Sequence, residues 1–417
     1  MSALAAAADL VAFGVGGWLV VPAVRRTGLL AWHPALAWIG LELVFFGVGA
    51  AILAVTDGRT GPALYVGAAV LAFGLAVWAS DRLANRRARG LQAGSDLGPS
   101  SLIRPIAVGL LAIASVAALL PTLLDVGLPF LAKDITGARS AVGGLDLQPF
   151  RVALPAAVLA IVLAAGRSGD QRTRVLAIIA CAIAIVAELA LASRYLAAEL
   201  IGLIVIGHGI GRRPIPIRTI AAIGLAVGMV FVAVGILRVY DEAAGREGRF
   251  AVERTVNRIL LIEPRTLDAL QTAIPGDQPF FGGLTWVRRL APVLGRDDVP
   301  NLGYWIYPRL FPDQAVPGYA APGLIGEAWA NLGWLGIALF GGLGLAVERL
   351  GALIAIRRRS VADVVAAALL VLFVARTHAV GLDGLAVLVV LVAVWRALAA
   401  PLDGLVNDLR RVCAWRA

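Results

Sequence analysis

The chain alternates between apolar runs of about 20 residues, the length that a helix needs to cross a bilayer, and short polar connections. About eleven of these runs are expected to be transmembrane helices. They cover roughly residues 3–23, 35–55, 62–80, 105–124, 151–166, 175–192, 195–210, 217–237, 323–346, 361–376 and 384–399. The pattern predicts an all-α polytopic membrane protein in which residues 1–417 form a single integral membrane domain.

One connection, residues 238–322, is far longer than an ordinary link between two spans. Two stretches within it, "RTVNRILLIEPRTLDALQTAI" and "GGLTWVRRLAPVL", carry apolar residues at helical spacing. We therefore expect an ordered, partly helical cap between the eighth and ninth spans.

Composition and charge indicate how the protein is oriented in the membrane. The chain is 60% hydrophobic, which excludes an ordinary soluble protein, and its net charge is +10. Arginines concentrate in the connections 81–104, 166–174, 211–218 and 356–360. This is the positive-inside pattern of membrane proteins and not a nucleic-acid-binding surface. It predicts cytoplasmic connections at these four places, and an N-terminus and a 238–322 cap on the external side.

Several polar residues lie at the predicted external ends of the spans, and an ionisable group in or beside a span suggests a function because it is costly there. They are Arg139, Arg194, Arg238, Glu327, Asn331, Arg376 and His378. Arginine binds phosphate through two parallel hydrogen bonds, and a carboxylate or a neutral imidazole can accept a proton from a sugar hydroxyl. Together these groups would suit glycosyl transfer from a lipid diphosphate.

Each of these residues also has a structural explanation. An arginine at the end of a span can extend its side chain to the interface between membrane and water. Glu327 can cap the start of its helix, Asn331 can form a hydrogen bond between helices, and His378 can be an ordinary loop residue.

Four stretches give the chain a resemblance to a known family. They are "WHPALAWIGLEL" after the first span, "GLPFLAKDITGARSAVGG" in the first large external connection, "ASRYLAAELIGLIVIG" at a central span, and "GGLTWVRRLAPVLGRDDVPNLGYWIYPRLFPDQAVPGYAAPGLIGEAWANLGWLGI" from the long connection into the ninth span. In this order and spacing they resemble the bacterial O-antigen polymerase family, whose members polymerise oligosaccharide repeat units.

The resemblance implies a multi-pass protein of the bacterial cell membrane with a GT-C-like helical fold. Its donor and acceptor would be polyprenyl-diphosphate-linked oligosaccharides, joined at the external face by metal-independent, inverting glycosyl transfer without a cofactor. A chain-length regulator would be a further partner. In this reading Arg139, Arg194, Arg238 and Arg376 bind the diphosphate, Glu327 or His378 acts as the base, and Asn331 positions the acceptor.

Two alternatives stay open. A ligase of the same kind would transfer finished glycan to a different acceptor, which an in-vitro transfer assay would identify. A transporter of a lipid-linked glycan or another anion would move its substrate without making a glycosidic bond.

Overall fold

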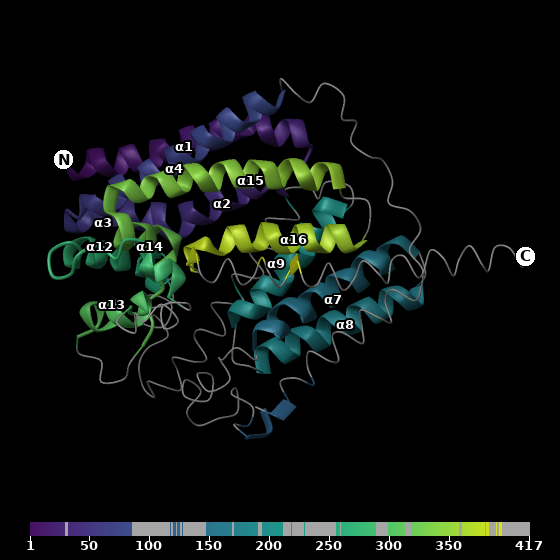
Figure 1. Cartoon of the computed structure of the whole chain (residues 1–417). Helices are drawn as coiled ribbons and strands as arrows, with labels where there is room; N and C mark the ends of the chain where they lie inside the picture. The colour runs from purple at the N-terminus through teal and green to yellow at the C-terminus, as the bar shows by residue number, and fades with distance from the viewer. Residues whose placement is uncertain are drawn as a thin grey trace, which may run out of the picture. The chain divides into compact units, whose positions relative to one another are not determined.

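The computed structural model describes most of the helical part of the chain. The described ranges are 1–29, 32–85, 147–168, 171–190, 194–211, 260–288, 299–312, 318–357 and 361–379, with shorter pieces such as 256–258 and 381–382. Every regular element in these ranges is a helix (Figure 1). The chain divides into two compact units. Unit 1 contains residues 1–92, 235–355 and 373–387, and unit 2 contains 93–234, 356–372 and 388–417.

Unit 1 begins with long apolar helices. The first is α1 (Ser2–Thr27). A second rod consists of α2 (Pro34–Glu42), the π-helical segment η2 (Leu43–Gly47) and α3 (Val48–Asp57). It is followed by α4 (Thr60–Asn85). Helices α1 and α4 pack closely, because a Cβ added to Gly74 of α4 would lie 2.9 Å from the Cα of Gly16. Small residues allow this approach where two helices cross in a membrane.

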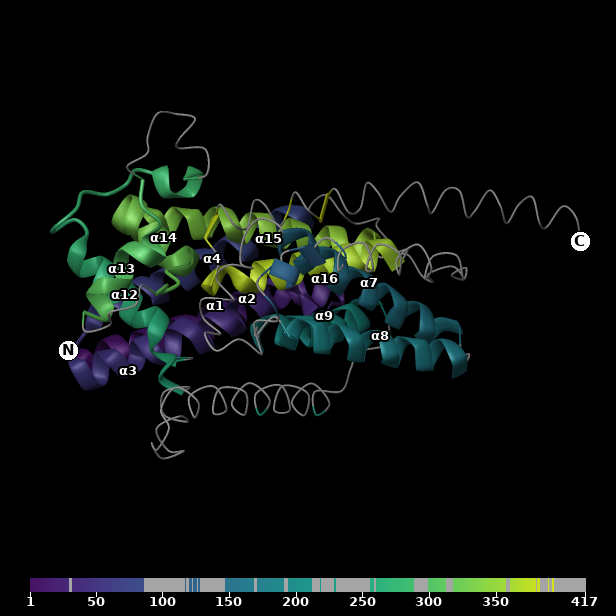
Figure 2. The ribbon, with the colours of Figure 1, turned by 90° about the horizontal axis from the view of Figure 1, so that it is seen from below.

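The segment after residue 260 supplies three short helices to unit 1. They are α12 (Ile262–Ala273), the 3-10 turn η4 (Leu284–Val287) and α13 (Leu302–Leu310). Helix α12 packs on α3, α4 and α14, with Leu267, Leu270 and Ile274 fully buried. These three helices lie within the long connection predicted at 238–322. Figure 2 shows them near the end of the long helices where the N-terminus lies.

The predicted ninth span is interrupted. Helix α14 (Gly323–Leu332) is buried at all but its last residue, and a 3-10 turn, η6 (Gly333–Gly336), separates it from α15 (Ile337–Arg357). The break occurs at Gly333, whose φ of +57° lies in the left-handed region, where a residue with a Cβ is strained. Residues 323–346 therefore form two helical pieces in place of one continuous helix.

Aromatic and aliphatic side chains form the core of unit 1. Trp38 stacks on Phe73 at 4.1 Å and contacts Phe340, while Tyr65 meets Trp329 edge-on. These contacts join the second rod, α4 and the interrupted span into one packed body.

Unit 2 contains α7 (Leu147–Ser168), α8 (Gln171–Ala190) and α9 (Arg194–Gly211). They pack through Leu154, Val158, Ala184 and Leu200. Large apolar residues of α8, among them Ile178 and Val186, stay exposed, as expected of a helix that faces lipid. Helix α16 (Val361–Ala375) follows later in the chain and ends in the 3-10 turn η7 (Arg376–His378).

The prediction of a helical membrane protein is confirmed in its coarse form. Within the described ranges, four helical stretches are long and apolar enough to cross a membrane, at Ser2–Thr27, Pro34–Asp57, Thr60–Leu83 and Gly323–Ala355. The total of eleven spans stays a prediction, since the fourth, eighth and eleventh lie largely outside the described residues.

Candidate functional site

Four of the predicted site residues are buried in unit 1. Glu327 and Asn331 lie on α14, and Arg376 and His378 belong to η7. Their exposed fractions are 8%, 0%, 8% and 4%, respectively. The sequence pattern located these polar residues at the ends of spans, and in the structure the protein buries them.

The other three predicted residues belong to unit 2 or lie outside the described residues. Arg139 and Arg238 lie outside the described residues. Arg194 is the first residue of α9 in unit 2, and its side chain lies outside the described part. A diphosphate-binding role for these three arginines stays a prediction.

The first turns of α14 pack directly against the chain that follows α16. The backbone N–H of Leu382 donates to Glu327 Oε2 at 3.0 Å. Gly323 has a φ of +58°, and a Cβ there would overlap the carbonyl of His378. The N-cap of α14 is Pro322, and no side chain caps it. Glu327 therefore binds a neighbouring segment instead of capping its own helix.

Asn331 uses its whole amide group within the protein. Its Nδ2 donates to Thr285 Oγ1 at 2.5 Å and to the Glu327 carbonyl at 2.8 Å. Its Oδ1 accepts the backbone N–H groups of Gly283 at 2.9 Å and Thr285 at 3.4 Å. This side chain fixes the segment around η4 to the end of α14, and direct contact with an acceptor sugar stays a prediction.

The same segment satisfies the end of the interrupted helix. The N–H groups of Phe281 and Gly282 donate to the carbonyls of Ala330 and Asn331, both at 3.0 Å. The last carbonyls of a helix need such partners when they are buried, and a helix can be interrupted at membrane depth only where protein supplies them.

His378 is held as a neutral imidazole. Its ring stacks on Phe45 with centroids 3.9 Å apart and an interplanar angle of 6°. Burial lowers the pKa of His378 to about 4. Its Nδ1 lies 3.0 Å from the Ala375 carbonyl, which can only accept, so Nδ1 carries the proton. The accepting lone pair of the ring is therefore on Nε2.

Further polar residues, which the predicted site does not include, lie beside this site. Glu42 is fully buried at the end of α2, and Thr377 Oγ1 lies 2.9 Å from its Oε1. Trp38 donates its indole N–H to the same hydroxyl at 2.7 Å. A signal was present, because Glu42 is a carboxyl group inside the apolar run "WIGLELVFFG", and an ionisable residue inside a span marks a functional site by default.

A second buried acid lies on α12. Glu263 is 7% exposed, and burial raises its pKa to about 8. At neutral pH Glu263 therefore exists largely as the neutral acid.

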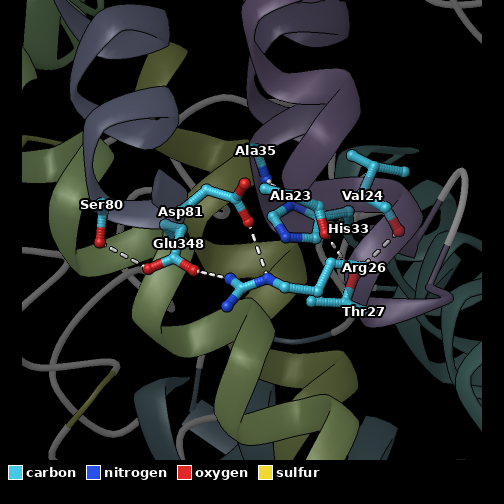
Figure 3. A network of polar contacts seen from close by, with 9 residues as sticks. All are labelled: Ala23, Val24, Arg26, Thr27, His33, Ala35, Ser80, Asp81 and Glu348. Carbon is cyan, nitrogen blue, oxygen red and sulfur yellow. Dashed lines mark hydrogen bonds and ion pairs between the residues drawn. The ribbon is translucent and has the colours of Figure 1, made fainter. Parts of the chain in front are cut away.

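A different polar network joins three helices farther along the bundle (Figure 3). Arg26 Nε lies 2.7 Å from Asp81 Oδ1, and Arg26 also pairs with Glu348. Ser80 donates to Glu348 Oε2 at 2.6 Å. Tyr65 of α4 donates to the Gly333 carbonyl. Since Ser80 is fifteen residues further along α4 than Tyr65, the network lies about 22 Å from the helix break.

Helices α1, α4 and α15 run in the same direction, because α4 meets the other two at two levels each. Gly74 lies beside Gly16 and Asp81 pairs with Arg26, while Tyr65 donates to Gly333 and Ser80 donates to Glu348. The predicted alternation requires this of the first, third and ninth spans. The two buried acids share one arginine, and this contact suits structure better than chemistry on a substrate.

The comparisons with known proteins identify no relative. No family model, curated protein or solved structure matches the chain. Among the described residues, no group of three or more His, Cys, Asp and Glu side chains is arranged to hold a metal ion.

Proposed function

We propose that the protein is a membrane glycosyltransferase that polymerises oligosaccharide repeat units carried on a polyprenyl diphosphate. One observation carries the proposal. An acid, a guanidinium and an imidazole, Glu327, Arg376 and His378, are buried together where α14 begins. A charged group costs about 2.5–3.5 kcal/mol at the centre of a transmembrane helix on insertion scales and less toward its ends, and three ionisable groups buried together at the end of a span favour a role in chemistry.

The roles follow from the chemistry of each group. Arg376 binds the departing diphosphate, because a guanidinium matches phosphate oxygens geometrically and stays charged. The neutral His378 has a pKa of about 4, so it is a weak base. It orients the acceptor hydroxyl by accepting a hydrogen bond at Nε2.

Glu327 then takes the hydroxyl proton as the hydroxyl oxygen attacks the anomeric carbon and the bond to the diphosphate breaks. Residues 281–285 and α12 cover this end of unit 1, which would exclude the water that otherwise hydrolyses the donor. In this proposal the reaction takes place at the external face of a bacterial cell membrane. The remaining arginines, Arg139, Arg194 and Arg238, also bind the diphosphate.

The test is a polymerisation assay with purified protein in lipid nanodiscs. Lipid-linked oligosaccharide extracted from the source organism lacking this gene serves as substrate, and a ladder of products on a gel is the readout. Arg376→Lys keeps the charge and removes the two-pronged phosphate contact, so we expect loss of the ladder. Arg309→Lys, at an exposed residue that stacks on Trp305, is the matched control and should keep it.

Size-exclusion chromatography establishes that both variants are folded. A full ladder from folded Arg376→Lys protein contradicts the assigned role. A wild-type protein that makes no product refutes the polymerase. Transfer of the glycan to a different acceptor would identify a ligase.

The interrupted helix favours a second candidate function, transport of an anionic lipid or solute. Transporters form substrate sites at discontinuous helices, and α14 and α15 are separated at Gly333. In sealed vesicles, a transporter moves the lipid-linked substrate across the bilayer and leaves its mass unchanged, whereas the polymerase produces longer glycans.

A further inference from the structure

Glu42 is a buried carboxyl group to which the proposed reaction assigns no role. It has no exposed surface, and the π-helical segment η2 begins at the next residue. Single π-helical turns occur often at functional sites, since they displace side chains from the regular helical register. The wide turn also carries Phe45, whose ring stacks on His378.

The hydrogen bonds of Thr377 determine the protonation state of Glu42. Thr377 Oγ1 has three partners, which are Trp38 Nε1 at 2.7 Å, Glu42 Oε1 at 2.9 Å and the Val374 carbonyl at 3.1 Å. A hydroxyl donates one hydrogen bond and accepts two. The indole can only donate and the carbonyl can only accept, so all three contacts are hydrogen bonds only when the single hydroxyl proton goes to the Val374 carbonyl.

The contact between Glu42 and Thr377 is then a hydrogen bond only if Glu42 donates it. An ionised Glu42 would compete with the Val374 carbonyl for the same proton. A neutral Glu42 satisfies all three bonds at once. Its other oxygen, Oε2, has no partner among the described residues, and such an oxygen is less costly to bury on a neutral acid than on a carboxylate.

We propose that Glu42 is a protonated positioning residue that donates a hydrogen bond to Thr377 and so holds the η7 turn, with Arg376 and His378, in its working geometry. This inference rests on the proposed glycosyl transfer. One helical rod acts on the turn at two points, through Glu42 on Thr377 and through Phe45 on the His378 ring. Glu42 itself does not touch the substrate.

A neutral donor can be replaced by an amide, and this gives the proposal its test. In Glu42→Gln, the Nε2 group donates to Thr377 as the acid did, so we expect wild-type polymerisation. Glu42→Leu has a similar volume and no donor. Because a displacement of about 1 Å far from the chemistry can cost 100-fold in rate, we expect kcat/KM to fall by about 100-fold at an unchanged melting temperature.

A second readout does not depend on the enzymatic activity. The chain has three histidines, so the ring nitrogen signals of His378 can be assigned by NMR through substitution of each histidine in turn. These signals should shift in Glu42→Leu and keep their wild-type positions in Glu42→Gln.

The outcomes separate this inference from the proposed function. If wild-type protein polymerises and Glu42→Gln is inactive, or if both variants shift the His378 signals alike, the positioning role is overturned. If wild-type protein makes no polymer and the NMR result is as expected, the glycosyl transfer fails while the hold of Glu42 on the turn is supported.

Discussion

Replacement of Asn331 by alanine should destabilise unit 1 more than the loss of an ordinary side chain would. The wild-type amide lies fully buried between α14 and the segment around η4. Asn331→Ala removes the acceptor of the Gly283 and Thr285 N–H groups and the donor to Thr285 Oγ1.

The magnitude follows from the groups left without partners. A buried donor that loses its acceptor costs about 1–3 kcal/mol. The Gly283 bond, at 2.9 Å, counts fully, whereas the Thr285 bond, at 3.4 Å, is weaker. The Thr285 hydroxyl oxygen loses only a donor, and an acceptor with an unfilled lone pair costs less than an unpaired N–H group. The sum is a loss of about 2–4 kcal/mol in the free energy of unfolding.

The assay is equilibrium unfolding in mixed detergent micelles, followed by tryptophan fluorescence. Asn301→Ala is the matched control, because Asn301 Oδ1 accepts a single bond, from Gly303 N at 3.2 Å at the start of α13. Loss of such a helix cap costs about 1 kcal/mol. Equal losses for the two variants, or no loss for Asn331→Ala, would refute the reasoning.

Further substitutions test the burial and packing of single groups. The folded-state pKa of His378, about 4, lies below its ordinary value of 6.5, so stability should fall by about 3 kcal/mol as the pH drops from about 6.5 to about 4, and His378→Gln should remove this fall. Glu263 has a raised pKa, about 8 against 4.5, so its contribution to stability changes with pH in the opposite direction. Its share of stability is lost as the pH rises from about 4.5 to about 8, and Glu263→Gln should remove that loss in the same unfolding assay. Arg26→Met leaves two buried carboxyl groups without their cation and should cost about 3 kcal/mol. Gly381→Ala places a Cβ on the Glu327 carboxylate and should lower the melting temperature, whereas Gly341→Ala, which meets nothing within 4 Å, should not.

Each of these expectations has a clear opposite outcome. A pH profile unchanged by His378→Gln or Glu263→Gln would mean that the group titrates normally. Wild-type stability of Arg26→Met would show that the two acids do not need the arginine. Equal melting temperatures for the two glycine variants would show that the 381–382 backbone can move away from Glu327.

The candidate site was only partly predictable from sequence. The sequence pattern indicates Glu327, Asn331, Arg376 and His378 through their places at the predicted external ends of spans. Their partners could not be predicted, because the N–H of Leu382 and the ring of Phe45 reach them only after distant segments pack. Glu42 was overlooked although its place in an apolar run was visible, since no nearby polar residue in the sequence indicated a partner.

The sequence by itself determined the helical membrane class. Apolar runs long enough to span a bilayer must form helices, because only internal hydrogen bonds satisfy the backbone in lipid. Tertiary structure alone decided that the ninth predicted span is interrupted at Gly333. A single glycine is tolerated within a helix, and this one marks a break because the N–H groups of Phe281 and Gly282 donate to the freed carbonyls of Ala330 and Asn331. Local patterns specify which segments are helical, whereas the protonation, partners and roles of the buried polar groups depend on which segments meet.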